Sequence, residues 1–131
     1  MNTRILILFA LLASLSVLPQ AFAQSAGTAG TEIDYLLDFV ETSGCEFYRN
    51  GTWYDSVRAQ EHLRDKYNYL SGINRIQTTE EFIERAASKS TLSGQAYEVR
   101  CGPCATTQAL AEWLQSVLAR YRNLVAREFE S

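Results

Sequence analysis

Residues 45–54 read CEFYRNGTWY, and this stretch decides the fold. Asn50-Gly51 between two aromatic-rich runs is the strongest short-range signal for a β-hairpin, because both residues tolerate the left-handed backbone of a two-residue turn. Side chains alternate between the two faces of a strand, so each aromatic pair is expected on its own face of the ribbon. The predicted register has three pairs: Arg49–Thr52, Tyr48–Trp53 and Phe47–Tyr54.

Helical patterns lie on both sides of the hairpin. The segment before it is predicted to be a helix that Thr31 caps and Gly44 ends. A second helix is predicted to begin at Asp55 or Ser56 and to end at Gly72. The inner faces of these helices repeat at three- and four-residue spacing: Ile33, Leu36, Leu37 and Val40 in the first, and Ala59, Leu63, Tyr67 and Leu70 in the second.

The second half of the chain adds two helices and one strand. Thr78 and Glu81 match a capping box, which predicts a third helix with Phe82, Ile83, Ala86 and Ala87 inside. A loop over 88–94 then leads to a strand over 97–101. The last helix is predicted over about 107–127, with an apolar stripe along it: Leu110, Trp113, Leu114, Val117, Leu118, Tyr121, Leu124 and Val125.

These elements give the order α-β-β-α-α-β-α. We expect an α+β fold, in which a small three-stranded antiparallel sheet packs against about four helices.

The N-terminus has the order of a secretory signal peptide: Arg4, an apolar run over 5–18, and the tripeptide Ala21-Phe22-Ala23. The apolar run is shorter than the roughly 20 residues of a membrane-spanning helix. We therefore predict a signal peptide over 1–23, a flexible lead-in over 24–30 and one domain over 31–131. The mature protein is expected in the periplasm or outside the cell, without stable membrane insertion.

The charge balance argues against nucleic acid as a partner. The chain has 12 basic and 15 acidic residues and a formal net charge of −3. A mildly acidic chain without a basic block attracts neither nucleic acid nor an anionic membrane surface.

Three cysteines, Cys45, Cys101 and Cys104, leave an odd thiol in an oxidising compartment. Residues 101–104 read CGPC, the active-site tetrapeptide of thioredoxin, between a predicted strand and a predicted helix. A thiolate at a helix N-terminus has a lowered pKa, as a redox cysteine needs. The surroundings differ from thioredoxin, because only one helix follows the motif and Pro103 is the single proline after the signal peptide.

A structural disulfide is the other interpretation. If strands 45–49 and 97–101 are antiparallel neighbours, Cys45 and Cys101 lie opposite each other at a spacing that suits a disulfide. Closing a loop of about 57 residues would stabilise the fold by about 4 kcal/mol. The pairings Cys45–Cys101, Cys101–Cys104 and Cys45–Cys104 all remain open.

Three groups of residues are candidates for binding. His62, the only histidine, lies one helical turn before Lys66, where it is a general base, a binding contact or a plain surface residue. Ser88 and Ser90 belong to a hydroxyl-rich loop that binds an anion or satisfies its own turns. Tyr48 and Trp53 form a platform for a sugar or an extended peptide if no helix covers them. No metal site, cofactor or catalytic constellation is predicted.

The chain resembles a family of small exported bacterial proteins, the YfeK-like domain-of-unknown-function family. The resemblance rests on five segments: EIDYLLDFVETSGCEFYRNG (32–51), HLRDK (62–66), TTEEFIERAASKSTLSG (78–94), YEVRCG (97–102) and EWL (112–114). It implies export, one compact domain and no assigned activity. Such proteins commonly carry cysteines resembling Cys45 and Cys101, and Cys104 departs from that pattern.

The sequence therefore favours a non-catalytic binding or accessory module of the bacterial cell envelope, whose partner is an unknown protein or envelope component. The alternative is a thiol-redox protein that uses Cys101 and Cys104. A hydrolase built on His62 comes third.

Overall fold

Asn50 and Gly51 form the turn between β1 (Glu46–Arg49) and β2 (Thr52–Tyr54) in the computed structural model, which describes residues 25–131. Their φ angles are 49° and 86°, so both lie in the left-handed region that a two-residue hairpin turn requires. The predicted register is confirmed, with Phe47 opposite Tyr54, Tyr48 opposite Trp53, and Arg49 opposite Thr52.

The sheet has one strand more than the sequence predicts. β1 also pairs with β3 (Glu98–Arg100), and β3 pairs with β4 (Gln108–Ala109). All the pairs are antiparallel and the strand order is β2-β1-β3-β4. The three-strand prediction is thus wrong by β4. Two residues are too short to show strand periodicity, and β4 forms because the chain returns beside β3, where the Leu110 N–H donates to the Tyr97 carbonyl at 2.9 Å.

Within residues 25–131, the helices α1 (Ser25–Thr42), α2 (Ser56–Gly72), α3 (Thr79–Ala86) and α4 (Leu110–Glu130) complete an α+β fold, as predicted. α1 begins at Ser25, so residues 25–30 of the predicted lead-in are helical, and the prediction that Thr31 caps the helix is wrong because Thr31 lies inside it. Burial explains the longer helix, because the Ala29 side chain is only 8% exposed and belongs to the core. Gly44, with φ 66°, follows the end of α1 as predicted.

Side-chain caps fix where α2 and α3 begin. The Asp55 carboxylate accepts a hydrogen bond from the Arg58 N–H at 2.9 Å, and Thr78 Oγ1 accepts one from the Glu81 N–H at 3.1 Å. The Glu81 carboxylate accepts from the Gln77 N–H at 2.7 Å. In a capping box this carboxylate would accept from the N–H of Thr78, but here it accepts from the N–H of the preceding residue, Gln77.

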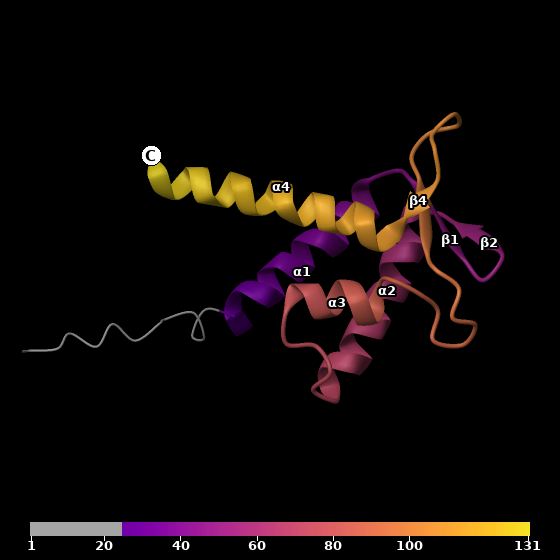
Figure 1. The fold of residues 1–131 in the computed structure, drawn as a ribbon, viewed down its shortest axis with the longest axis horizontal. Helices are drawn as coiled ribbons and strands as arrows, with labels where there is room; N and C mark the ends of the chain where they lie inside the picture. Colours follow the sequence, from indigo (N-terminus) through magenta and orange to yellow (C-terminus); the bar gives the residue numbers. More distant parts are fainter. Residues whose placement is uncertain (1–24) are drawn as a thin grey trace, which may run out of the picture.

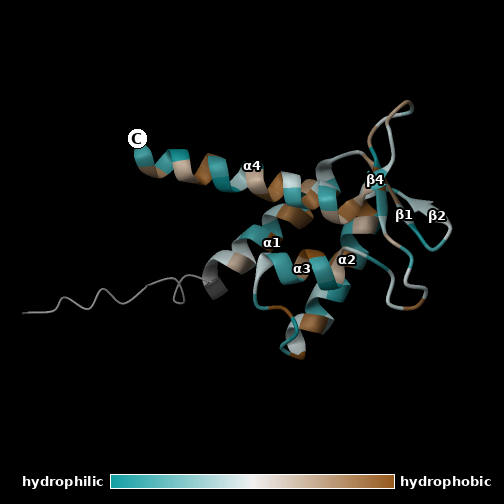
Figure 2. Cartoon of the chain, viewed as in Figure 1, coloured by the Kyte–Doolittle hydropathy of each residue, from teal (hydrophilic) through white to brown (hydrophobic). Residues whose placement is uncertain are grey.

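Figure 1 shows the sheet at one end of the molecule and the helices packed together beside it, with α4 running along α1. α1 lies at the centre of the core, since its four predicted inner residues are at most 1% exposed. The buried part of α4 ends earlier than its apolar stripe. Leu118 is 4% exposed, whereas Leu124 is 56% and Phe129 is 87% exposed on the part of α4 that projects beyond α1. Hydrophobic positions continue along this projecting part (Figure 2).

None of the helices within residues 25–131 is long and apolar enough to cross a membrane. The predicted signal peptide, 1–23, lies outside the described residues.

A disulfide joins Cys45 to Cys101, with an S–S distance of 2.05 Å and a Cα–Cα distance of 4.3 Å. The pair directly follows the Glu46–Arg100 pair of β1 and β3, which places the two cysteines across the same antiparallel ladder. Cys45 is buried at 5% exposure, and Cys104 is an exposed free thiol. The bond therefore ties together two strands that lie 56 residues apart in the sequence.

Replacing Cys45 and Cys101 together by alanine is expected to lower the free energy of unfolding by about 4 kcal/mol, because the unfolded chain regains the freedom of a long open loop. Urea unfolding of the oxidised protein measures the loss. The matched control, Cys104→Ser, is expected to stay within about 0.5 kcal/mol of the parent protein, because the thiol is exposed. A similar loss in both variants would contradict a structural role specific to Cys45–Cys101.

Candidate functional site

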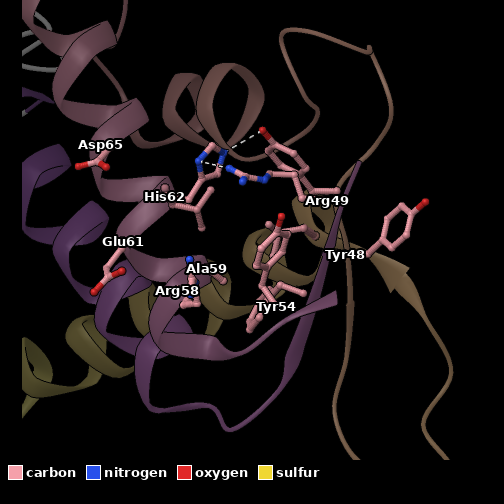
Figure 3. Close-up of a pocket in the computed structure, with 12 residues that line it drawn as sticks. Tyr48, Arg49, Tyr54, Arg58, Ala59, Glu61, His62 and Asp65 are labelled. Atoms are coloured by element: carbon pink, nitrogen blue, oxygen red, sulfur yellow. Dashed lines mark hydrogen bonds between the residues drawn. The ribbon is translucent and has the colours of Figure 1, made fainter. Parts of the chain in front are cut away.

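A pocket of about 220 Å³ opens between the β-hairpin and α2. Pockets that take drug-sized ligands have volumes of roughly 300–1,000 Å³, so this one suits a small molecule or the end of a larger one. Figure 3 shows the Arg49 and His62 side chains pointing toward each other across it. The lining combines apolar, aromatic and charged side chains: Phe47, Tyr48, Arg49, Tyr54, Arg58, Ala59, Glu61, His62, Leu63, Asp65, Tyr97 and Leu110.

Strand alternation brings Arg49 and Tyr97 to the pocket. Arg49 lies two residues after the buried Phe47, so it is on the inner face of β1. Tyr97 lies two residues before the buried Val99 and therefore shares the inner face of β3. An inward-facing arginine at the end of a strand is thus placed beside the helix layer.

Helix periodicity brings His62 and Lys66 to the same place from the other side. They lie one turn apart on α2, and His62 stands next to the buried Leu63 on the side that faces the sheet. Both His62 and Lys66 are half-buried. The predicted pair His62 and Lys66 is therefore brought together in the structure with Arg49 and Tyr97.

Both ring nitrogens of His62 have partners. An Arg49 guanidinium nitrogen is hydrogen-bonded to Nδ1, and the Tyr97 hydroxyl lies 3.1 Å from Nε2. Since a guanidinium only donates, Nδ1 accepts, and a neutral ring then carries its proton on Nε2. His62 consequently donates to the Tyr97 hydroxyl oxygen.

Tyr97 receives a second donor from Lys66. Lys66 Nζ lies 3.4 Å from the Tyr97 hydroxyl and 5.1 Å from the centre of its ring. The same ammonium donates to the Lys89 carbonyl at 2.8 Å, which fixes its position. Tyr97 itself is only 4% exposed.

The surroundings hold His62 neutral. Burial is the largest cause that lowers its pKa from 6.5 to about 4, and the positive charges of Arg49 and Lys66 lower it further, against a small opposing effect of Asp65. Burial and Arg49 also lower the pKa of Lys66. Burial raises the pKa of the Tyr97 phenol. The imidazole is thus a neutral hydrogen-bonding group across the physiological pH range.

Arg49 is positioned by an aromatic ring as well as by His62. Its guanidinium lies 4.9 Å from the centre of the Tyr54 ring, and a hydrogen bond from Arg49 lowers the pKa of that phenol. The ion pairs within residues 25–131 join Arg64 to Asp34, Arg100 to Glu46, and Arg122 to Glu32 and Glu80. Neither Arg49 nor Lys66 takes part in any of them. Arg49, which lines the pocket, and Lys66, which contacts Tyr97 beside it, are therefore two cations without an ion-pair partner within residues 25–131.

This geometry does not suit His62 to general-base catalysis. A general base needs a free lone pair directed at the substrate, whereas the lone pair on Nδ1 accepts from Arg49. A catalytic histidine is commonly oriented by a carboxylate, and here a cation takes that position. Within the part of the chain that the structure describes, no group of three or more His, Cys, Asp or Glu residues could hold a metal ion.

The other predicted candidates take no part in the hydrogen bonds that join Arg49, His62 and Tyr97. The Tyr48 and Trp53 rings pack at a tilt with their centres 5.4 Å apart, and the Tyr48 side chain points away from His62 (Figure 3). Arg100 lies 3.9 Å above the Trp53 ring. Trp53 on this partly covered outer face of the sheet does not line the pocket, and Tyr48 does.

The two candidate serines have structural partners. Ser90 is 4% exposed, and its hydroxyl accepts hydrogen bonds from the Asn50 side chain and from the Leu92 and Ser93 N–H groups. Ser88 donates to the Glu84 carbonyl at the end of α3. The turn interpretation of this loop accounts for both residues.

A family of unknown function, DUF5329, matches residues 27–122. The chain belongs to this family. One relative is the uncharacterized protein YfeK of Salmonella typhimurium (strain LT2), which is 34% identical over 92 residues, or 70% of this chain and 74% of the relative. No solved structure matches the chain significantly. The resemblance to the YfeK-like family is thereby confirmed, and it brings no assigned activity with it.

Sequence reasoning missed Arg49, Tyr54 and Tyr97 as site residues of this family member. The hairpin register contained the signal for two of them, because Arg49 and Tyr54 lie on the same face of the ribbon as the buried Phe47. A charged side chain on the inner face of a strand needs a polar neighbour. His62 is that neighbour, and only the packing of α2 against β1 reveals it.

In an NMR pH titration, His62 is expected to titrate with a pKa of about 4 instead of 6.5. As the pH falls, His62 therefore becomes protonated in the unfolded chain before it does in the folded chain. The contribution of neutral His62 to the free energy of unfolding is complete above pH 6.5 and is lost as the pH falls toward 4. Relative to His62→Gln, the parent protein should lose more stability across this range in urea unfolding. Arg49→Gln removes a neighbouring cation and should move the pKa upward. A His62 pKa near 6.5 would contradict the buried, cation-flanked environment.

Proposed function

We propose that the chain is a non-catalytic binding module of the bacterial cell envelope, and that its ligand site is the pocket between the β-hairpin and α2. The observation that carries this proposal is the set of contacts around His62. Both ring nitrogens are occupied, and the surrounding Arg49, Tyr97 and Lys66 are fixed by further contacts. A rigid, polar, concave site without a free catalytic base suits binding better than turnover.

The partner is a small molecule or the exposed end of an envelope component. A volume of about 220 Å³ excludes a folded protein surface from the pocket itself. The outer face with Tyr48 and Trp53 is a second, weaker candidate surface, because Arg100 already covers one ring of that pair.

The thiol-redox alternative has less support. A CGPC redox site needs Cys101 and Cys104 to exchange a disulfide with each other, and Cys101 is already bonded to Cys45. If the redox function were correct, Cys104→Ser would abolish it and mild reductant would open the disulfide. We expect Cys104→Ser to bind ligand as the parent protein does.

A small fragment library, screened by NMR on the oxidised protein, is expected to give binders whose chemical-shift changes cluster at Arg49, Tyr54, His62 and Tyr97. Ala59→Leu places extra carbon atoms in the pocket lining and should abolish this binding. Ala119→Leu, on an exposed position of α4, is the matched control and should bind normally. A library without any binder in the pocket, or binders that Ala59→Leu does not affect, would overturn the proposed site.

Expression of the full chain in a bacterium is expected to give a mature protein in the periplasmic or extracellular fraction, with Gln24 as its first residue. The reason is the order of basic, apolar and small residues over 1–23. Intact-mass and N-terminal sequence measurements after fractionation check both points. An uncleaved chain in the cytosol would contradict the envelope part of the proposal.

A further inference from the structure

We propose that the pocket binds a carboxylate carried by a small apolar or aromatic group, with Arg49 and Tyr97 contacting the carboxylate and Lys66 adding positive charge beside them. The inference rests on the proposed binding function and adds the chemical class of the ligand.

The first argument is a count of hydrogen-bond donors. Arg49 donates to His62, His62 donates to Tyr97, and Lys66 also donates to Tyr97. The Tyr97 oxygen thus accepts twice, and its own O–H finds no acceptor among the hydrogen bonds of residues 25–131. Tyr97 is more than nine-tenths buried, where an unused donor is costly. A ligand oxygen would supply the acceptor that this cluster lacks.

The second argument is the positive charge on either side of the His62–Tyr97 pair, from Arg49 and from Lys66. Arg49 and Lys66 are both half-buried, and Arg49 makes Lys66 harder to protonate. Two like charges held near each other in half-buried positions repel each other, and a bound anion reduces that repulsion. An anion bound in the pocket beside Arg49 would be attracted by both charges.

The third argument is the preorganisation of Arg49. His62 and the Tyr54 ring hold the guanidinium at a fixed orientation. The guanidinium has five N–H donors, so several remain for a ligand. A planar fork of this kind matches the two oxygens of a carboxylate.

The lining contains two carboxylates that lie apart from the Arg49–His62 pair. Glu61 and Asp65 line the pocket, are exposed, and point away from the Arg49–His62 pair (Figure 3). Arg58, also exposed, offsets only one of these two negative charges. The charged lining residues are thus two arginines and two acids, which suits a singly charged carboxylate better than a phosphate dianion.

The apolar part of the lining defines the rest of the ligand. Its side chains surround a small volume, which excludes a long polar chain from the pocket. An aliphatic or aromatic group beside the carboxylate would bury against them. These apolar lining residues are Phe47, Ala59, Leu63 and Leu110.

Titration of the oxidised protein with phenylacetate, phenylacetamide and inorganic phosphate, followed by NMR, tests the inference. Phenylacetate is expected to bind about tenfold or more tightly than its neutral amide, because charge-assisted hydrogen bonds distinguish the two. Phosphate should bind more weakly than phenylacetate. Equal binding of acid and amide, or tighter binding of phosphate, would overturn the inference.

Variants assign the effect to named residues. Arg49→Gln should weaken phenylacetate binding by about tenfold and Tyr97→Phe by about fivefold, while phenylacetamide binding changes little. Arg75→Gln removes the same charge from an exposed position outside the pocket and serves as the matched control. Arg49→Lys, which keeps the charge but not the fork, should fall between the parent protein and Arg49→Gln. Equal effects of Arg49→Gln and Arg75→Gln would contradict the proposed contact.

A fourth probe distinguishes the two kinds of ligand that could carry such a carboxylate, a free small acid and the C-terminus of a peptide chain. N-acetyl-glycyl-phenylalanine presents the carboxylate at the end of a peptide, and its amidated form is the control. Tighter binding of this acid than of phenylacetate would identify a chain terminus as the natural ligand, and weaker binding would identify a free small acid. If neutral fragments bind in the pocket and acids bind no better, the proposed binding function stands and only the inference of a carboxylate ligand is overturned. If no probe binds in the pocket in any titration, both the proposed function and the carboxylate inference are overturned.

Discussion

The register of β1 is the constraint on which the rest of the structure depends. β1 is paired on both sides, with β2 through the Asn50-Gly51 turn and with β3 through a ladder that the Cys45–Cys101 disulfide extends. A shift of one residue would turn Phe47 out of the core and Arg49 away from α2. A two-residue turn and a covalent bond at opposite ends of a four-residue strand therefore specify the core and the pocket together.

Local signals were sufficient for most of the fold. The hairpin register, the Asp55 and Thr78 caps and the Gly44 stop each depend on a few neighbouring residues, and all of them appear in the structure. The failures lie where tertiary contacts decide. β4 exists because β3 offers it an edge, and residues 25–30 are helical because Ala29 is buried against the core. β4 leaves no periodic pattern in the sequence, whereas Ala29 lies four residues before Ile33 and extends the apolar face of α1 by one turn.

In the candidate site, too, local sequence signals predict some features and tertiary contacts decide the others. His62 and Lys66 could be predicted as a pair from their spacing on one helix. Their connection to Tyr97 spans 35 and 31 residues, and no pattern within one element encodes it. The structure also changes the chemical meaning of the histidine. Viewed alone it is a candidate base, but between a guanidinium and a phenol it becomes a neutral link that orients two other donors.

Asn50 satisfies two demands at once. Its backbone forms the hairpin turn, and its side chain donates to Ser90 Oγ at 3.1 Å and accepts from Ser93 Oγ at 2.5 Å. Glycine would keep the turn but lose both bonds, while aspartate would keep an acceptor but lose the donor. Ordinary hairpin turns interchange these three residues freely. At this position, asparagine is the one of these three residues that keeps both the turn and the two side-chain hydrogen bonds. Substitutions of residue 50 should therefore separate turn formation from attachment of the neighbouring loop.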